Sequence, residues 1–384
     1  LIEPVGTLGA DVVLNGDFEE TGADQVLNGD FSQEGAELVT NGDFATDSDW
    51  DKGTGVVISG GKAVFTNVNT AVQALGQFSF LQIGKTYKIT FTISDYVQGG
   101  IYILRPTSLG SGSAVSANGT FSFTTEAQTS ASLILYTLGT TTLSIDNVSV
   151  VEVGQDWSLG DKWSIIDNAA RLVSADSAAS TLSQDNVFTV GKNYKITLDA
   201  VVVSGIAKIS GLGGTFIESI DETKTYSIYW VADTTTLTFN RQSTISDITI
   251  TNITAEEVGQ EWSLTDGVSI TAQGARITSD GTNQYIQQGG ALVIGDTYEI
   301  EYEITESVSG SLSTDSLDTA ITLKNTVGVH KFYGVATNTI LRVKRYASPT
   351  DITIDNIKIK RLNGDDTPRI DYTDGGCPVL LTEP

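Results

Sequence analysis

The sequence predicts an all-β protein: three tandem β-sandwich modules of the jelly-roll type, preceded by a short repeat arm. Three observations support this prediction. The chain of 384 residues contains 39 Gly and only 6 Pro, and it is rich in Thr, Ser, Val and Ile, which favours short strands joined by turns. Apolar and polar residues alternate along the expected strands. Several landmarks recur three times at a spacing of about one hundred residues.

The first 36 residues hold a 13-residue repeat, in which Asn-Gly-Asp-Phe ends at Phe18, Phe31 and then Phe44. Each unit offers a short extended piece, an Asn-Gly turn and one apolar anchor. A unit this small cannot fold alone. Its Phe can be buried only against neighbouring units, another subunit or the first module. We interpret residues 1–36 as an attachment or oligomerisation arm that uses Phe18, Phe31 and Phe44; a flexible leader is the alternative.

Three landmarks divide the rest of the chain into modules at 37–153, 154–258 and 259–362. The landmarks are an entry tryptophan, a strand tyrosine and a closing asparagine: Trp50, Trp157 and Trp262; Tyr87, Tyr194 and Tyr298; Asn147, Asn252 and Asn356. Their offsets are 107 and 105, 107 and 104, and 105 and 104 residues. One module runs into the next without a linker, so we expect a stiff rod of stacked sandwiches.

Period-two patterning predicts the strands within a module. From Tyr87 to Ser94 every odd position is apolar and every even position is polar, as expected for a strand with one face on a core. The C-terminal tail, 363–384, differs in composition and is too short to fold alone. We expect it to pack on the third module or to lead into a missing or cleaved region. Because the chain begins at Leu1 and has no Met, we expect a processed product or a fragment.

Charge and cysteine content exclude several classes of partner and scaffold. The net charge of −25 and the pI of about 4.2 oppose binding to nucleic acid or to an anionic membrane. The single Cys377 excludes an intramolecular disulfide. No apolar run reaches the roughly 18 residues that a membrane helix needs.

Catalytic motifs are missing from the sequence, so we expect no enzymatic activity and no required cofactor. The only histidine, His330, falls in a predicted strand and is interpreted as a surface or interface residue. No nucleophile elbow, phosphate-binding loop or His/Cys metal cluster appears. A glycosidase needs only two carboxylates about 5–9 Å apart, so a catalytic depolymerase stays an alternative.

Aromatic residues are the candidates for sugar contact, because a pyranose presents an apolar face and a ring of hydroxyl groups. The recurring Trp50, Trp157 and Trp262 behave as core residues, and we assign them to packing. Four aromatic residues lack strict counterparts in the other modules: Trp230, Tyr136, Tyr102 and Tyr333. We interpret these four as candidate glycan-binding residues, with a buried or interface role as the alternative.

The opening, middle and closing motifs of module one resemble those of a known family. Leu38 to Phe44 opens the module, Gly84-Lys85-Thr86-Tyr87 lies in its middle, and Ile145-Asp146-Asn147-Val148 closes it. This arrangement resembles the galactose-binding-like jelly rolls of carbohydrate-binding modules. The repeated Asn-Gly-Asp-Phe leader and the tail from Pro368 to Pro384 are similar to segments of bacteriophage tail-fibre and other virion surface proteins.

These resemblances imply a structural virion surface protein, a fibre or decoration subunit, located outside the cell. The implied partners are other virion proteins, further copies of the chain, with a homotrimer favoured, and a host surface polysaccharide. The alternative is a secreted polysaccharide-binding module array of a bacterial glycoside hydrolase, or a cell-surface adhesin. The resemblance also implies structural calcium near Asp43, Asp146 and Asn147; a tight turn and capped strand ends are the other interpretation.

Modules two and three do not begin with Asn-Gly-Asp-Phe. They begin with Gly-Gln-Asp-Trp and Gly-Gln-Glu-Trp, which contain Trp157 and Trp262. We therefore expect that the motif is not required for the sandwich fold. On this view the copies around Phe18 and Phe31 are strands that dock elsewhere, not remnants of lost domains.

Overall fold

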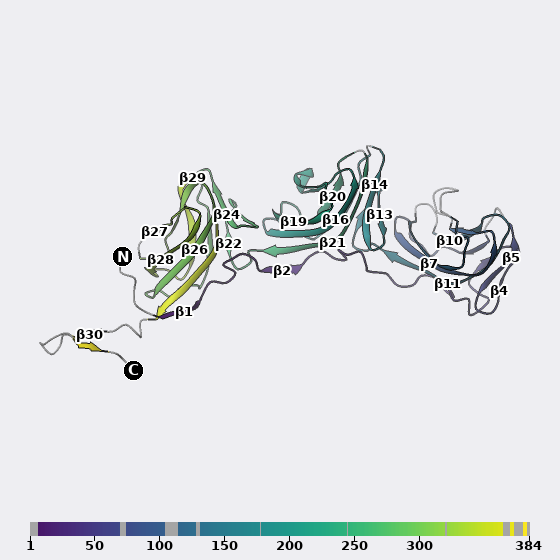
Figure 1. The fold of residues 1–384 in the computed structure, drawn as a ribbon, viewed down its shortest axis with the longest axis horizontal. Helices are drawn as coiled ribbons and strands as arrows, with labels where there is room; N and C mark the ends of the chain where they lie inside the picture. Colours follow the sequence, from purple (N-terminus) through teal and green to yellow (C-terminus); the bar gives the residue numbers. More distant parts are fainter. Residues whose placement is uncertain are drawn as a thin grey trace.

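The computed structural model describes residues 7–69, 74–103, 114–127, 131–176, 178–243, 245–318, 321–363, 369–371 and 379–381. Its regular structure is all β apart from one 3₁₀ turn, η1 (Leu212–Gly214). The predicted all-β class is therefore confirmed. Figure 1 shows three β-sandwich modules in a row along the long axis of the molecule.

Alternating burial explains why the predicted strands form. In β7 (Thr86–Gln98), Tyr87, Ile89, Phe91 and Ile93 are all buried in one core, whereas the intervening side chains are only half-buried. Since successive side chains of a strand point to opposite faces, a period of two places one apolar row on the core. Each module has an apolar core of its own.

Module 1 packs two antiparallel sheets, ordered β3-β6-β10-β8 and β4-β5-β11-β7-β9. Besides β7, its strands are β3 (Asp51–Lys52), β4 (Val56–Ile58), β5 (Ala63–Val68), β6 (Leu75–Gln77), β8 (Ile101–Ile103), β9 (Gly119–Glu126), β10 (Leu133–Thr137) and β11 (Thr141–Val153). The closing strand, β11, pairs with β5 along its first part and with β7 along most of its length.

Module 2 repeats this plan with sheets ordered β12-β15-β20-β17-β18 and β13-β14-β21-β16-β19. Its strands are β12 (Ser158–Leu159), β13 (Trp163–Ile166), β14 (Ala169–Ser174), β15 (Thr181–Gln184), β16 (Asn193–Ser204), β17 (Ala207–Ser210), β18 (Phe216–Ile220), β19 (Lys224–Val231), β20 (Leu237–Arg241) and β21 (Ser246–Val258).

Module 3 joins its two layers into one connected sheet, because two strands are long enough to pass from one layer to the other. Its strands are β22 (Ser263–Leu264), β23 (Val268–Thr271), β24 (Gly274–Ser279), β25 (Tyr285–Gln288), β26 (Thr297–Thr314), β27 (Ile321–Thr322), β28 (Gly328–Val335) and β29 (Leu341–Asn363). The long closing strand, β29, pairs first with β25 and then with β24, and it pairs with β26 along most of its length.

The arm runs back along the row of modules in the direction opposite to their sequence. Strand β1 (Thr7–Asp11) pairs with the end of β29 in module 3, and β2 (Thr21–Asp24) pairs with the end of β21 in module 2. Glu34 then forms a bridge with Val153 at the end of β11. Figure 1 shows β1 beneath the module-3 sheets and β2 beneath β21.

The tail contributes one small hairpin, β30 (Arg369–Asp371) with β31 (Val379–Leu381). Cys377 and most of 363–384 lie outside the described residues. No helix among the described residues has the length and apolar character to cross a membrane.

Candidate functional site

Each module carries a groove that holds one Asn-Gly-Asp-Phe unit. Phe18 is buried in the core of module 3, Phe31 in that of module 2 and Phe44 in that of module 1, with 2%, 1% and 1% of their surface exposed. Each ring packs on the entry tryptophan of its module, with centroids 5.1–5.4 Å apart and planes inclined by 40–42°. The prediction that these tryptophans are packing residues is confirmed.

Three side chains fix each docked segment. Two belong to the module and bond to the backbone of the segment, and one belongs to the segment and bonds to the backbone of the closing strand. A glutamine amide both donates to and accepts from one residue of the docked unit, at 2.8–3.0 Å: Gln288 for Leu14, Gln184 for Leu27 and Gln77 for Thr40. The entry tryptophan donates through Nε1 to the Asn carbonyl of the motif, at 2.9–3.1 Å. A carboxylate of the docked unit accepts from an N–H of the closing strand at 2.9 Å: Asp11 from Ile359, Asp24 from Ala255 and Glu37 from Val150.

The glycine of the motif is required by a close approach to the closing strand. Its carbonyl accepts from the N–H of Ile357, Ile253 or Val148. A Cβ at Gly16, Gly29 or Gly42 would lie 2.0 Å from the carbonyl oxygen of that same residue. The Asn and Phe of every unit adopt φ between 47 and 55°, which is unusual for a bulky side chain. The buried Phe and the backbone hydrogen bonds hold this conformation in place.

Within one chain Phe18, Phe31 and Phe44 are all buried in the modules, and the expected attachment or oligomerisation role of residues 1–36 stays a prediction. The docking corrects another prediction. The sequence predicts that Asn-Gly-Asp-Phe is unnecessary in modules two and three, but each of these modules receives the motif from the arm. A signal for this pairing exists in the sequence: Gln77, Gln184 and Gln288 recur at module spacing, and three units match three entry tryptophans.

Both joints between modules are crossed twice. The main chain crosses at Gly154 and Gly259, both at φ 72°. The arm crosses module 3 to module 2 through Glu19 and Glu20, since Phe18 is in the module-3 core and Thr21 pairs with Val258. It crosses the other joint through Ser32 and Gln33 in the same way. Neighbouring modules also touch directly, and the N–H of Ile270 donates to Asn193 Oδ1 at 2.9 Å.

Several carboxylates lie close together at the groove of module 3. Burial, followed by the nearby carboxylates of Asp17, Glu303 and Glu19, raises the pKa of Asp355 to about 6. One of its carboxyl oxygens, Oδ1, is buried without a hydrogen-bond partner. Because Asp17 and Glu19 belong to the arm, docking of the first unit brings further negative charge to a carboxyl group that is already poorly solvated.

The four predicted glycan-binding aromatics do not form one site. Tyr102 and Tyr136 lie together on the four-stranded sheet of module 1, half-exposed and stacked with ring centroids 5.6 Å apart. Trp230 of module 2 packs edge-on to Phe188 at 5.0 Å against the core of its module. In module 3 the Tyr333 hydroxyl donates to the buried Glu299 carboxylate. All four side chains are half-buried, and Tyr102 and Tyr136 are the two among them that stack on each other.

The predicted calcium residues lie where the docked unit meets the closing strand of module 1. Asp43 accepts from the N–H of Ala45 at 3.2 Å, and Asp146 accepts from the N–H of Asn147 at 2.6 Å. The described residues contain no group of three or more His, Cys, Asp or Glu side chains suited to a metal ion. Calcium takes six to eight oxygen ligands, and two carboxylates with one amide fall short of that set. Calcium at Asp43, Asp146 and Asn147 stays an untested prediction.

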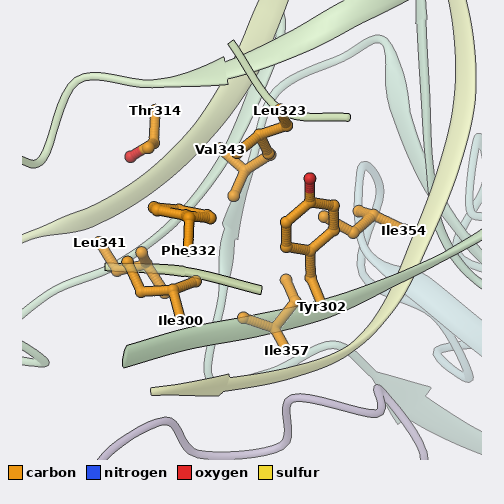
Figure 2. Close-up of a pocket in the computed structure, with 9 residues that line it drawn as sticks. All are labelled: Ile300, Tyr302, Thr314, Leu323, Phe332, Leu341, Val343, Ile354 and Ile357. Atoms are coloured by element: carbon orange, nitrogen blue, oxygen red, sulfur yellow. The ribbon is translucent and has the colours of Figure 1, made fainter. Parts of the chain in front are cut away.

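Two kinds of hollow are found among the described residues. Figure 2 shows an apolar gap inside module 3, about 10 Å³ in volume, between Tyr302, Phe332 and surrounding aliphatic side chains. It has room for about one water molecule, so it is a packing defect. Each joint between modules also has a surface hollow beside the entry tryptophan, of about 440 Å³ at Trp262 and about 270 Å³ at Trp157. An ion pair spans each: Lys192 with Glu257, and Lys85 with Glu152.

Comparisons with known proteins find structural likeness only. No family model and no curated protein matches the sequence. The chain is similar to the N-terminal CBM22-1-CBM22-2 tandem domain from Paenibacillus barcinonensis, with 11% identity over 54% of this chain and 94% of that one and a TM-score of 0.24. A fucolectin from striped bass serum matches with 6% identity over 51% and 86% and a TM-score of 0.21. A chain of Sulfolobus Turreted Icosahedral Virus matches with 12% identity over 82% and 90% and a TM-score of 0.20.

Proposed function

We propose that this chain is a non-enzymatic virion surface protein, a fibre or decoration subunit that acts as a stiff spacer held at module 3 with module 1 at its free tip. The observation that supports this polarity is the register of β1 with β29. Thr7 lies opposite Asn363, so the start of β1 and the end of β29 lie at the same end of the row. Module 1 lies at the opposite end of the row (Figure 1).

Stiffness is part of the proposed role. A joint crossed by a single strand of chain can bend about a few backbone dihedral angles, whereas two antiparallel crossings restrain each other. Here each arm crossing has only two residues between docked positions, and the ion pair of Lys88 with Glu34 at 2.6 Å adds a tie between arm and module 1. The virion setting and the favoured homotrimer rest on the sequence resemblance of the leader and tail.

Electron microscopy of tagged full-length chains tests the polarity and the shape. Tags placed before Leu1 and after Pro384 are expected at one end of a straight particle. A tag in the Gly60-Gly61 turn, where a side chain would meet little or nothing, is expected at the other end. Bent particles, or end tags at opposite ends, would refute the spacer. Mass measurement over a concentration series tests the trimer, and a persistent monomer would contradict it.

A second candidate function, glycan binding at the tip, is favoured by the stacked Tyr102 and Tyr136. Stacked, half-exposed rings offer the flat apolar surface that a pyranose ring requires. Binding of host surface polysaccharide should fall at least tenfold in Tyr136→Ala. The matched control is Tyr346→Ala, which removes an exposed tyrosine of module 3. Equal binding by the two variants would exclude the platform.

A further inference from the structure

We propose that the three arm grooves also accept the arm of a second copy of this chain, so that copies are joined by exchange of Asn-Gly-Asp-Phe strands. Each groove already binds a segment that is remote in sequence. The Asp11 carboxylate meets the N–H of Ile359 across 348 positions of chain, and Asp24 meets Ala255 across 231. Nothing in the contact itself requires the two partners to belong to one molecule.

The contacts do not distinguish one unit from another. The glutamine pair, the tryptophan donor, the carboxylate acceptor and the buried Phe are the same in all three grooves, and corresponding distances agree within a few tenths of an ångström. Most of these hydrogen bonds go to arm backbone. A groove that recognises the backbone and one aromatic ring should therefore bind any of the three units, as in the addition of a strand to a sheet edge.

The first unit is the one best placed to exchange. Units two and three are held on both sides by docked neighbours, whereas the first unit is tied to the next docked segment only through the exposed Glu19 and Glu20. It also bears the unfavourable charge around Asp355. Its own short tether gives an effective concentration in the millimolar range. In dilute solution, the arm of a second copy is far below this concentration and cannot displace the chain's own unit. When copies are packed side by side, the local concentration of their arms becomes comparable with the effective concentration of the tethered unit.

A disulfide trap in the full-length chain tests the exchange. Leu8 and Leu362 are register partners across β1 and β29, so Leu8→Cys with Leu362→Cys can close within one molecule or between two. The background carries Cys377→Ser. The matched control is Thr92→Cys with Thr120→Cys, a pair on β7 and β9 whose hydroxyl oxygens lie 3.0 Å apart. Neither of those strands belongs to the arm.

Two differently tagged populations are mixed, incubated up to millimolar concentration and then oxidised. The expected result for the arm pair is mixed disulfide-linked dimers, whose yield rises at least severalfold with protein concentration. The control pair should give monomers only. Monomers only from both pairs, or equal dimer yields from both, would overturn the proposal.

As a second measurement, a labelled peptide of residues 7–20 should bind full-length Phe18→Ala at least tenfold more tightly than the wild type. A peptide that itself carries Phe18→Ala should not bind; equal binding by the two peptides would also overturn it.

Discussion

Module 1 and module 3 use the same groove in two different ways. In module 1 the docked unit is continuous with the sandwich, because Phe44 is followed within a few residues by Trp50. In module 3 the docked unit, around Phe18, precedes Trp262 by more than half of the chain. The local contacts are nevertheless the same. What differs is the length of chain that must be closed to form them.

That difference implies an order of docking. Closure of a flexible loop costs entropy that grows with the logarithm of its length. Once the third unit is docked on module 1, only Ser32 and Gln33 separate it from the second groove, and Glu19 and Glu20 then separate the second unit from the third groove. The arm should therefore dock from module 1 toward module 3. The most remote contacts depend on the local ones, and the reverse does not hold.

The largest expected effect comes from replacing the motif glycines. Gly42→Ala should cost module 1 more than about 4 kcal/mol, because its Cβ would overlap the Val148 carbonyl oxygen. It should also cost module 2 about 1–2 kcal/mol through the longer loop. Gly16→Ala should weaken module 3 by a similar large amount and leave the other modules unchanged.

Hydrogen exchange resolved by module measures both variants. Gly289→Ala is the control, since its Cβ would meet nothing within 4 Å. Purely local losses in both variants would disprove the order of docking.

Replacing the glutamine that bonds to the docked unit tests whether the grooves contribute equally to stability. Gln288→Ala removes two hydrogen bonds to Leu14, and Gln77→Ala removes the equivalent pair to Thr40. Each change should cost its own module about 1–3 kcal/mol, because part-buried backbone groups lose their partners. Chemical denaturation with entry-tryptophan fluorescence reports the loss. A much smaller cost in module 3 would mean that its unit is already largely undocked.

Asp355 should make the stability of module 3 depend on pH. Its pKa is raised to about 6 in the folded protein, so the folded state binds the proton more tightly than the unfolded state, where the ordinary value is near 3.8. Its contribution to stability is therefore greatest at low pH and is lost as pH rises from about 4 through about 6. Asp355→Asn should raise the melting temperature of module 3 at about pH 7 and leave it unchanged near pH 3. A rise of equal size at both pH values would contradict this assignment.

The smallest expected effect is that of a chelator. If calcium binds at Asp43, Asp146 and Asn147, the thermal midpoint of module 1 should fall in the presence of a chelator, because a ligand that binds only the folded state stabilises it. Asp43→Asn should abolish that shift. An identical melting curve for the wild type with and without the chelator would remove calcium from the description of this chain.

The amino-acid sequence by itself determines the modules. Period two in Tyr87 to Ser94 specifies one buried face, and burial is a local consequence of that pattern. The recurrence of Trp50, Trp157 and Trp262 at one spacing identifies three equivalent cores. Each of these features depends on residues close together in the chain or on a simple repeat, so the sequence alone is enough to infer it.

Only the tertiary structure decided where the arm goes and which end of the rod is free. The motif around Phe18 carries no information about its partner beyond a shape that all three grooves share. Its pairing with module 3 follows from the antiparallel path of the arm and from short crossings at the joints, which are properties of the whole chain in space. The same holds for Tyr102 and Tyr136: each lacked a counterpart in sequence, and pairing of β8 with β10 brought them together.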